Sequence, residues 1–484
     1  MFKTWKIVKQ PLDQSVVSCK WVFLVKYGTD GRPERFKARL VARGFSQQFG
    51  VDYEQTFTPV IRFESLRALF AIAAREKMSI HMMDAQNAYL NSDLDKEVYM
   101  EVPEGVENAE GSGSVCLLLK SLYGLKQSAN LWNKRITSTV RSFGFEPITA
   151  EPSIFIDKRG VIIALYVDDL LIFVKNESDV ERVKRLVKNK HIMKNMGEVS
   201  KVLDIHVTRP NDGFVRIDQN HYIQQILMEF GMENAKPAST PMSSSIKLDD
   251  ETSEILSRND HELYRRIIGK SMFAAVAVRI DIAFAVNRLS QYLSEPRKVH
   301  LQAAKHVLRY LKGSPNLGIL YKSTPVSDLV GYADAAYANA RQFKSTTGFC
   351  YMINGAPVSW TSKRQSITAQ STTESEYIAL SEAGKQAVWL RHLLYALRKS
   401  HVYTKKSTLI YADNQGSIDL SANPVFHSRT KHIQVRYHAI REYIENGEIR
   451  VQFLPTDRML ADGLTKGLDH VKFARMIEGL GLSN

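Results

Sequence analysis

Residues 161–174, VIIALYVDDLLIFV, consist of two apolar runs joined at the adjacent carboxylates Asp168 and Asp169. Short apolar runs rich in β-branched residues predict a buried β-hairpin that carries both carboxylates at its turn. Burying two like charges there is costly unless a cation neutralises them. Mg²⁺ prefers carboxylate oxygens together with substrate phosphates, so it is the first candidate. The alternative is an ordinary Asp-Asp turn with both side chains in water.

A third carboxylate, Asp84, ends the strand-like segment HMMD at residues 81–84. From a neighbouring strand edge, Asp84 would project toward Asp168 and Asp169. Three carboxylates on two neighbouring strands can hold two metal ions ~3.5–4 Å apart, one activating a 3′-hydroxyl and one holding a leaving pyrophosphate. The alternative role of Asp84 is a cap at the end of its strand.

The last third of the chain offers four more acidic residues. Asp334 lies in the strand-like LVGYADAAYA, Asp413 ends the strand-like TLIYAD, and Asp462 lies in LADGLTK ahead of a helix. Glu376 begins a helix and faces the same way as its apolar stripe, so its side chain needs a partner. Two alternatives remain open. Glu376 could close a capping box with Thr373, and Asp413 could cap the helix that follows it.

The bulk composition describes an ordinary globular chain with a basic surplus. At 484 residues it is too long for one core, so two to four domains are expected. Lys and Arg number 65 against 51 Asp and Glu, a net charge of +14 that suits a polyanionic partner such as nucleic acid. A basic but unrelated enzyme would show the same surplus. No apolar run reaches the ~18 residues of a membrane span, and no secretory signal stands at the start.

Local patterns divide the chain further. Residues 20–26 and 37–45 predict a hairpin around a turn-rich stretch, and residues 65–77 predict a helix. Residues 236–256, rich in Pro, Ser and Thr, are interpreted as a linker. From about Leu329 strands and helices alternate, which predicts a separate α/β domain. The three cysteines are too few and too far apart for a disulfide framework or a zinc site.

Ordered motifs give the chain a family resemblance. They run KWVFLVK, KARLVARGF, TFTPVIRFESLR, MDAQNAYLN, VYMEVPEG, SLYGLKQSANLW and LYVDDLLIF, and later GYADAAYA, KSTTGF, STTESEYIAL, YADNQGS and LADGLTK. The first set resembles the reverse transcriptase region of Copia-type (Ty/Copia) retrotransposon Pol polyproteins. The second set resembles the ribonuclease H region of the same polyproteins.

The resemblance implies an α/β and α+β multidomain fold. A right-hand polymerase with fingers, palm and thumb-like parts would occupy residues 1–245. A helical connection would follow over 246–325, and a ribonuclease H-like mixed-sheet domain over 326–484. The implied partners are an RNA template, a DNA primer, an RNA–DNA hybrid and deoxynucleoside triphosphates, without a membrane. The implied cofactor is Mg²⁺ or Mn²⁺, two per active site. The implied location is cytoplasmic, in virus-like particles or outside them.

The resemblance also assigns roles position by position. The metal-binding catalytic residues would be Asp84, Asp168 and Asp169 for polymerisation, and Asp334, Glu376, Asp413 and Asp462 for cleavage. The substrate-binding residues would be Lys37, Arg39, Tyr89, Gly124, Lys126 and Gln127, with Tyr89 crowding the sugar 2′-position. Candidate contacts to hybrid phosphates are Lys363, Arg364, Arg429 and Lys431.

Three positions depart from the family pattern. Ala129 and Ile280 stand where Pro is usual, and Asp204 stands where Gly is usual in a segment that resembles the primer grip. A carboxylate at Asp204 would repel primer phosphates. The alternative function is therefore a truncated, weakly active or inactive relic that retains nucleic-acid binding. No protease or integrase motif is found in the chain, which suits a processed product, a truncated reading frame or a decayed copy.

Overall fold

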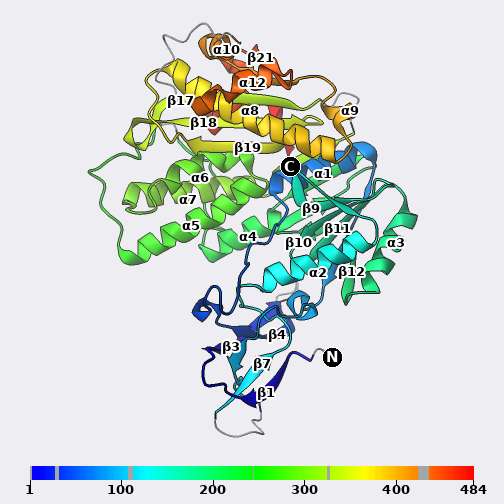
Figure 1. Cartoon of the computed structure of the whole chain (residues 1–484). Coiled ribbons are helices and arrows are strands. Elements are labelled where there is room, and N and C mark those ends of the chain that lie inside the picture. Colours follow the sequence, from blue (N-terminus) through cyan, green and yellow to red (C-terminus); the bar gives the residue numbers. More distant parts are fainter. Residues whose placement is uncertain (1–2, 28–31, 107–112, 244, 324–327, 423–434) are drawn as a thin grey trace. The chain divides into compact units, whose positions relative to one another are not determined.

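The structure is a computed structural model that describes residues 3–27, 32–106, 113–243, 245–323, 328–422 and 435–484. It divides into two compact units that interleave along the chain (Figure 1). Unit 1 comprises residues 1–61 and 80–198, and unit 2 comprises residues 62–79 and 199–484. The sequence predicted three consecutive domains, at residues 1–245, 246–325 and 326–484. That division differs from the two interleaved units, and the predicted boundaries stay predictions.

Unit 1 contains a six-stranded sheet that carries the predicted hairpin. Its order is β12 (Met193–Glu198), β5 (Ser79–Ala85), β11 (Asp169–Val174), β10 (Ile162–Tyr166), β9 (Glu151–Ile156) and β8 (Glu146–Ile148). Strands β10 and β11 pair in antiparallel register, with Tyr166 opposite Asp169, so the hairpin prediction is confirmed. Helices α2 (Ser128–Ser142) and α3 (Glu177–Lys188) bury their apolar stripes with this sheet in one hydrophobic core.

The rest of unit 1 consists of smaller β structures. One is a four-stranded sheet in the order β1 (Trp5–Lys9), β7 (Ser114–Leu118), β6 (Tyr99–Glu101) and β2 (Val16–Val17). The other is a long two-stranded ribbon of β3 (Cys19–Tyr27) and β4 (Pro33–Ala42), which confirms the second predicted hairpin. The ribbon has one largely apolar face, because Trp21, Phe23 and Val25 stand opposite Leu40, Ala38 and Phe36.

Unit 2 begins with α1 (Phe63–Glu76), the helix predicted at residues 65–77. The helix is buried from Ser65 to Ala74, a stretch in which Ser65 and Arg67 are the two polar residues. It contacts β15 (Phe214–Asp218), β16 (Gly318–Lys322) and β19 (Ala356–Arg364). Strands β15 and β16 belong to an antiparallel sheet completed by β13 (Lys201–Val202), β14 (Ile205–Thr208) and β22 (Leu482–Ser483).

The helical part of unit 2 follows the predicted linker. It consists of α4 (Asn220–Glu229), α5 (Arg258–Ala277), α6 (Ala283–Ser290) and α7 (Lys298–Gly313). The described part of residues 236–256 forms no helix or strand, but Met242, Leu248 and Leu256 are buried. The linker interpretation is therefore wrong in one respect, since the segment packs against the protein through its apolar side chains.

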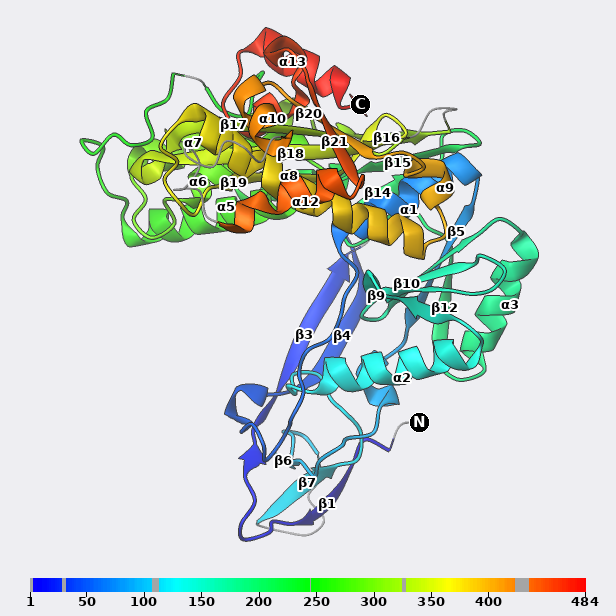
Figure 2. The same cartoon turned by 45° about the horizontal axis from the view of Figure 1, so that its top comes forward.

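The C-terminal part of unit 2 is a mixed five-stranded sheet with helices. The order is β19, β18 (Lys344–Ile353), β17 (Val330–Ala340), β20 (Thr408–Ala412) and β21 (Ile449–Phe453). The first three strands pair antiparallel, and β17, β20 and β21 pair in parallel. Helices α8 (Thr372–Ala396), α10 (Gln415–Ala422) and α12 (Ala439–Glu445) gather on one face (Figure 2). A mixed sheet with helices is the architecture that was predicted for this part of the chain.

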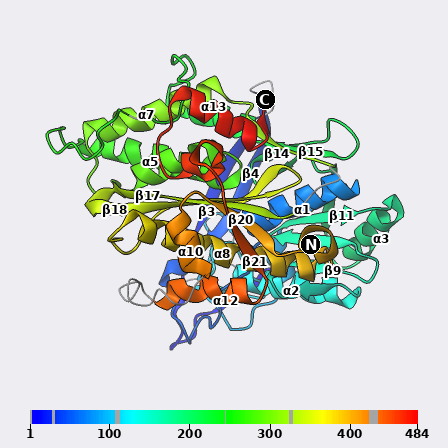
Figure 3. The same cartoon turned by 90° about the horizontal axis from the view of Figure 1, so that it is seen from above.

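Helix α13 (His470–Gly479) lies beside α7 (Figure 3), where the rings of Phe473 and Tyr310 meet edge to face at 5.5 Å. No helix of the described residues is both long and apolar enough to cross a membrane.

Candidate active sites

The three aspartates of unit 1 lie on neighbouring strands. Asp84 is on β5, Asp168 is in the β10–β11 turn, and Asp169 begins β11, which pairs next to β5 in the sheet. The amide of Ala85 donates a hydrogen bond of 2.8 Å to the carbonyl oxygen of Asp168, which ties the turn to β5. The sequence therefore predicted correctly that Asp84 and the hairpin turn would be neighbours.

The electrostatics of Asp169 reflect this crowding. Burial, followed by the negative charges of Asp168 and Asp84, raises the pKa of Asp169 to about 7. The raised pKa shows that the ionised form of Asp169 is poorly stabilised beside the other two carboxylates. The site therefore lacks compensating positive charge. A divalent cation with oxygen ligands fits this donor set, because it would offset the repulsion that raises the pKa.

Two tyrosines border the aspartates. Tyr89 and Tyr123 meet edge to face at 4.7 Å, and the guanidinium of Arg39 lies 5.5 Å from the centre of the Tyr123 ring. Burial and then the charge of Asp168 raise the pKa of both phenols. Tyr89 and Arg39, both predicted substrate-binding residues, are thus linked through Tyr123 to the aspartates. The sequence analysis missed Tyr123, although it stands inside the motif SLYGLKQ.

The remaining predicted substrate-binding residues differ in their exposure. Lys37 lies on β4 and is half-buried, and Lys126 is exposed. Gly124 has φ +92°, and a Cβ there would meet the carbonyl oxygen of Ala42 at 2.0 Å, so the backbone requires glycine. Gln127 is fully buried.

The Gln127 side chain is bonded inside the protein. Its amide donates 2.8 Å to the carbonyl of Asp52, and its oxygen accepts 3.1 Å from Gln47. The side chain of Gln127 therefore holds its own segment in place.

Each of the three residues that depart from the family pattern fits its place in the structure. Ala129 is the second residue of α2, where proline is also compatible with a helix. Ile280 is fully buried and fills core space. Asp204 is exposed in the two-residue turn between β13 and β14, has φ +55°, and forms a salt bridge of 2.7 Å with Lys201. The salt bridge compensates part of the negative charge that the sequence analysis expected to be unopposed.

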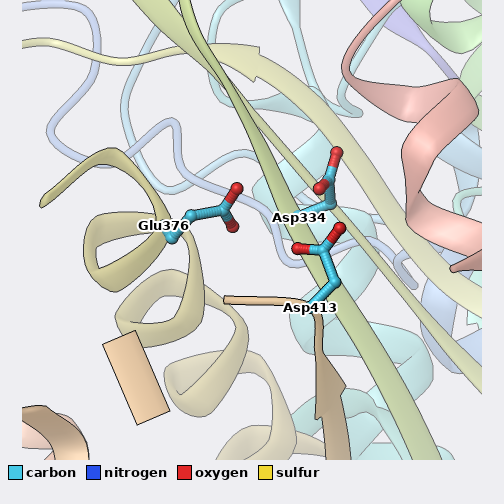
Figure 4. Close-up of side chains that lie close together, drawn as sticks. All are labelled: Asp334, Glu376 and Asp413. Atoms are coloured by element: carbon cyan, nitrogen blue, oxygen red, sulfur yellow. The ribbon is translucent and has the colours of Figure 1, made fainter. Parts of the chain in front are cut away.

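A second acidic cluster lies in unit 2. Asp334 is on the central strand β17, Glu376 is on α8, and Asp413 directly follows β20, the parallel neighbour of β17. Their carboxylates point toward one another (Figure 4), and one oxygen of each lies within 4.8 Å of the others. Over the described ranges this is the one acidic group with such mutual separations, whereas the unit 1 aspartates are more widely spread.

Burial dominates the electrostatics of this cluster as well. It raises the pKa of Glu376 to about 10 and that of Asp334 to about 7, with further contributions from neighbouring carboxylates. Glu376 is 9% exposed and Asp334 is 3% exposed, so water screens little of the repulsion. Three carboxylates that point toward one another, two of them buried with raised pKa values, are the donor set of a divalent cation site.

Asp462, the fourth predicted ligand, lies in a 3₁₀ helix (Leu460–Leu464) beside the cluster. Its carboxylate is paired with the ammonium of Lys466, and it is not one of the three residues whose oxygens lie within 4.8 Å of one another. The hydroxyl of Thr465 donates to Asp334 and also lies 2.9 Å from the backbone oxygen of Asp462. The sequence analysis missed both Thr465 and Lys466, although each stands in LADGLTK.

Neither capping alternative is correct. Helix α8 begins earlier, with Ser371 as the N-cap that accepts from the amide of Glu374, so Glu376 is free of the cap. Asn414, not Asp413, accepts from the amide of Ser417 at the start of α10.

Among the candidate phosphate contacts, Lys363 and Arg364 lie at the end of β19. Arg429 and Lys431 lie outside the described residues.

Comparisons with known proteins point in one direction. The family model described as "Reverse transcriptase (RNA-dependent DNA polymerase)" matches residues 2–244. The "Retrovirus-related Pol polyprotein from transposon TNT 1-94" of Nicotiana tabacum is 37% identical over 99% of this chain, which covers 36% of that protein. The transposon RE1 polyprotein of Arabidopsis thaliana is 36% identical over 99% of the chain, which covers 33% of it.

One relative is shorter than this chain, and almost its whole length is matched. The "Putative transposon Ty5-1 protein" of Saccharomyces cerevisiae is 33% identical over 62% of this chain and 98% of its own length. Two solved foamy viral protease-reverse transcriptase structures, one titled "dRH", both with double-stranded DNA, share 13% identity. Each covers 93% of this chain, with 67% and 79% of the solved chains covered and TM-scores of 0.49 and 0.47. The family assignment rests on the family model and the sequence relatives.

Proposed function

Since the chain belongs to the reverse transcriptase (RNA-dependent DNA polymerase) family and is related to Copia-type retrotransposon Pol polyproteins, we propose that it is an RNA-directed DNA polymerase that also cleaves the RNA of RNA–DNA hybrids. The chain spans about a third of the length of the first two polyprotein relatives. The observation that carries the proposal is the presence of two separate carboxylate clusters, one in the family-matched region and one in the mixed-sheet region.

In polymerisation, the proposed work of Asp84, Asp168 and Asp169 is to hold divalent cations and the reacting phosphates in one geometry. Mg²⁺ or Mn²⁺, two per site, would supply Lewis-acid activation of the primer 3′-hydroxyl and charge stabilisation for the departing pyrophosphate. Catalysis of phosphoryl transfer is mostly positioning and electrostatics, which suits three carboxylates that paired strands and their turn hold in one region of the sheet.

The substrates would be an RNA template, a DNA primer and deoxynucleoside triphosphates. Arg39 and Lys37 provide positive charge for the triphosphate. Tyr89, whose raised pKa reflects the nearby charge of Asp168, would be the aromatic ring that excludes a ribose 2′-hydroxyl.

In cleavage, Asp334, Glu376 and Asp413 would hold the cations, with Asp462 joining after separation from Lys466. The basic surplus of +14 supports binding of the hybrid backbone without sequence preference. The relic alternative predicts binding without catalysis. The complete set of seven carboxylates argues against it, because a decayed site has no reason to retain all of them.

Two matched substitutions test both activities in one protein. Asp168→Asn should abolish primer extension on an RNA template while cleavage of a labelled RNA–DNA hybrid persists. Asp334→Asn should do the reverse, so each variant is the folding control for the other. Primer extension by Asp168→Asn at the wild-type rate would contradict the polymerase assignment. Hybrid binding without either activity in the wild type would favour the relic.

A further inference from the structure

The β10–β11 turn has an unfavourable backbone conformation at Val167. The turn consists of two residues, Val167 and Asp168, and Val167 has φ +53°. A β-branched residue in the left-handed region is a true outlier, since its side chain crowds the backbone there. Such a conformation persists only where surrounding contacts hold it.

Two hydrogen bonds hold the carbonyl groups of this turn. The indole nitrogen of Trp132, on α2, donates 2.7 Å to the carbonyl oxygen of Val167. The amide of Ala85 donates 2.8 Å to the carbonyl oxygen of Asp168. Each bond fixes the orientation of one peptide plane, so together they define the two peptide groups that follow the Cα of Val167, one on each side of Asp168.

The donor on α2 is itself fixed. Trp132 is 2% exposed, and its ring meets the edge of His191 at 5.3 Å. His191 is bonded in turn to the Thr139 hydroxyl at 2.8 Å. A buried tryptophan whose N–H finds one carbonyl acts as a rigid directional donor.

We propose that Trp132 is a positioning residue for polymerisation, and the proposal rests on the polymerase function stated above. Its indole N–H holds the Val167 carbonyl and keeps the turn in the left-handed conformation. That conformation sets where the side chains of Asp168 and Asp169 leave the turn, next to the strand that carries Asp84. Without the donor, Val167 relaxes to negative φ, the peptide plane rotates, and the two carboxylates leave their shared geometry.

The first test removes the donor and keeps an aromatic ring. Trp132→Phe should lower kcat for nucleotide addition roughly ten- to a hundredfold, the cost of a misplacement on the order of 1 Å. KM for the nucleotide and Kd for the primer–template should change less than about twofold, because the residue touches neither. Hybrid cleavage should keep its wild-type rate.

A matched control separates this effect from general loss of packing. Trp360, in unit 2, also donates its indole N–H to a backbone carbonyl, that of Ala275 at 2.9 Å. Trp360→Phe should leave kcat for nucleotide addition at the wild-type value. An equal loss of kcat in both variants would overturn the proposal.

The second test is a double-mutant cycle with Val167→Gly. Glycine adopts φ +53° without crowding and needs no external donor. Trp132→Phe should therefore cost no more than about threefold in kcat in the Val167→Gly background. The same cost in both backgrounds would show that Trp132 acts through packing alone.

The cycle also distinguishes this inference from the proposed function. An inactive wild type would contradict the polymerase proposal. Thermal unfolding then decides the inference, since Trp132→Phe should lower Tm more with Val167 present than after Val167→Gly. Equal decreases in Tm would overturn it.

Discussion

At the scale of single residues, Asp169 makes the stability of the metal-free protein depend on pH. Its pKa is raised to about 7 by burial and by Asp168 and Asp84. Between about pH 4, where an unfolded aspartate ionises, and pH 7, the folded protein binds a proton that the unfolded chain has lost. The free energy of unfolding therefore falls as pH rises through this window. Asp334 and Glu376 act in the same direction, with pKa values raised to about 7 and about 10.

The decrease in the free energy of unfolding with rising pH predicts how Mg²⁺ changes thermal stability. Without metal, Tm should be lower at pH 8 than at pH 6. Adding Mg²⁺ should raise Tm by a few degrees more at pH 8, because the cation binds the ionised carboxylates. Differential scanning fluorimetry at both pH values measures the effect. In Asp169→Asn the pH dependence should be smaller, and an identical Mg²⁺ shift at pH 6 and pH 8 would contradict the explanation.

At the scale of elements, the loop that carries Thr465 supports the strand that carries Asp334. Thr465 is fully buried, and its hydroxyl donates to the Asp334 carboxylate. Removing this donor raises the pKa of Asp334 further, because the hydrogen bond favours the ionised form.

Thr465→Val should therefore lower hybrid cleavage roughly tenfold at neutral pH, the typical size of a lost hydrogen bond to a charged group. The pH–rate profile of cleavage should move to higher pH. Primer extension should not change, and Thr465→Ser, which keeps the hydroxyl, should restore most of the cleavage. An unshifted pH–rate profile in Thr465→Val would exclude this role.

The helices and strands also show which features the sequence could predict and which it could not. The β10–β11 hairpin and helix α1 follow from local periodicity, and both were predicted near their observed bounds. The contact between Thr465 and Asp334 joins residues 131 positions apart, so no local sequence pattern predicts it. The start of α8 was misjudged because Ser371 and Thr373 are both good caps, and only tertiary packing chooses between them.

At the scale of the whole molecule, unit 2 depends on a helix that precedes most of unit 1 in the chain. Arg67 on α1 is fully buried and has backbone carbonyls as partners. It donates to Val358 at 2.8 Å and to Val276 and Ala277 at 2.6 and 2.8 Å, with its guanidinium 3.7 Å from the Trp360 ring centre. The bonds to Val276 and Ala277 satisfy carbonyls in the last turn of α5, where the helix itself supplies no donors.

A fragment of residues 199–484 should therefore be less stable than its fold suggests. Without α1, the surfaces of β16 and β19 that the helix covers face water. The loss should exceed about 5 kcal/mol, because each buried Leu, Ile or Phe contributes ~1.5–3 kcal/mol. Fusing residues 62–79 through a flexible linker should recover it. Urea unfolding followed by circular dichroism compares the two, and equal midpoints would contradict the dependence on α1.

The interleaving of the two units also governs how the chain is made. Residues 62–79 leave the ribosome before the first residue of their remaining partner segment, and the 119 residues from 80 to 198 separate the two segments. Translation proceeds at ~5–20 residues per second. The apolar helix α1 is therefore without its partner segment for on the order of ten seconds. The speed of translation over residues 80–198 thus sets how long chaperones or other nascent chains have access to that helix.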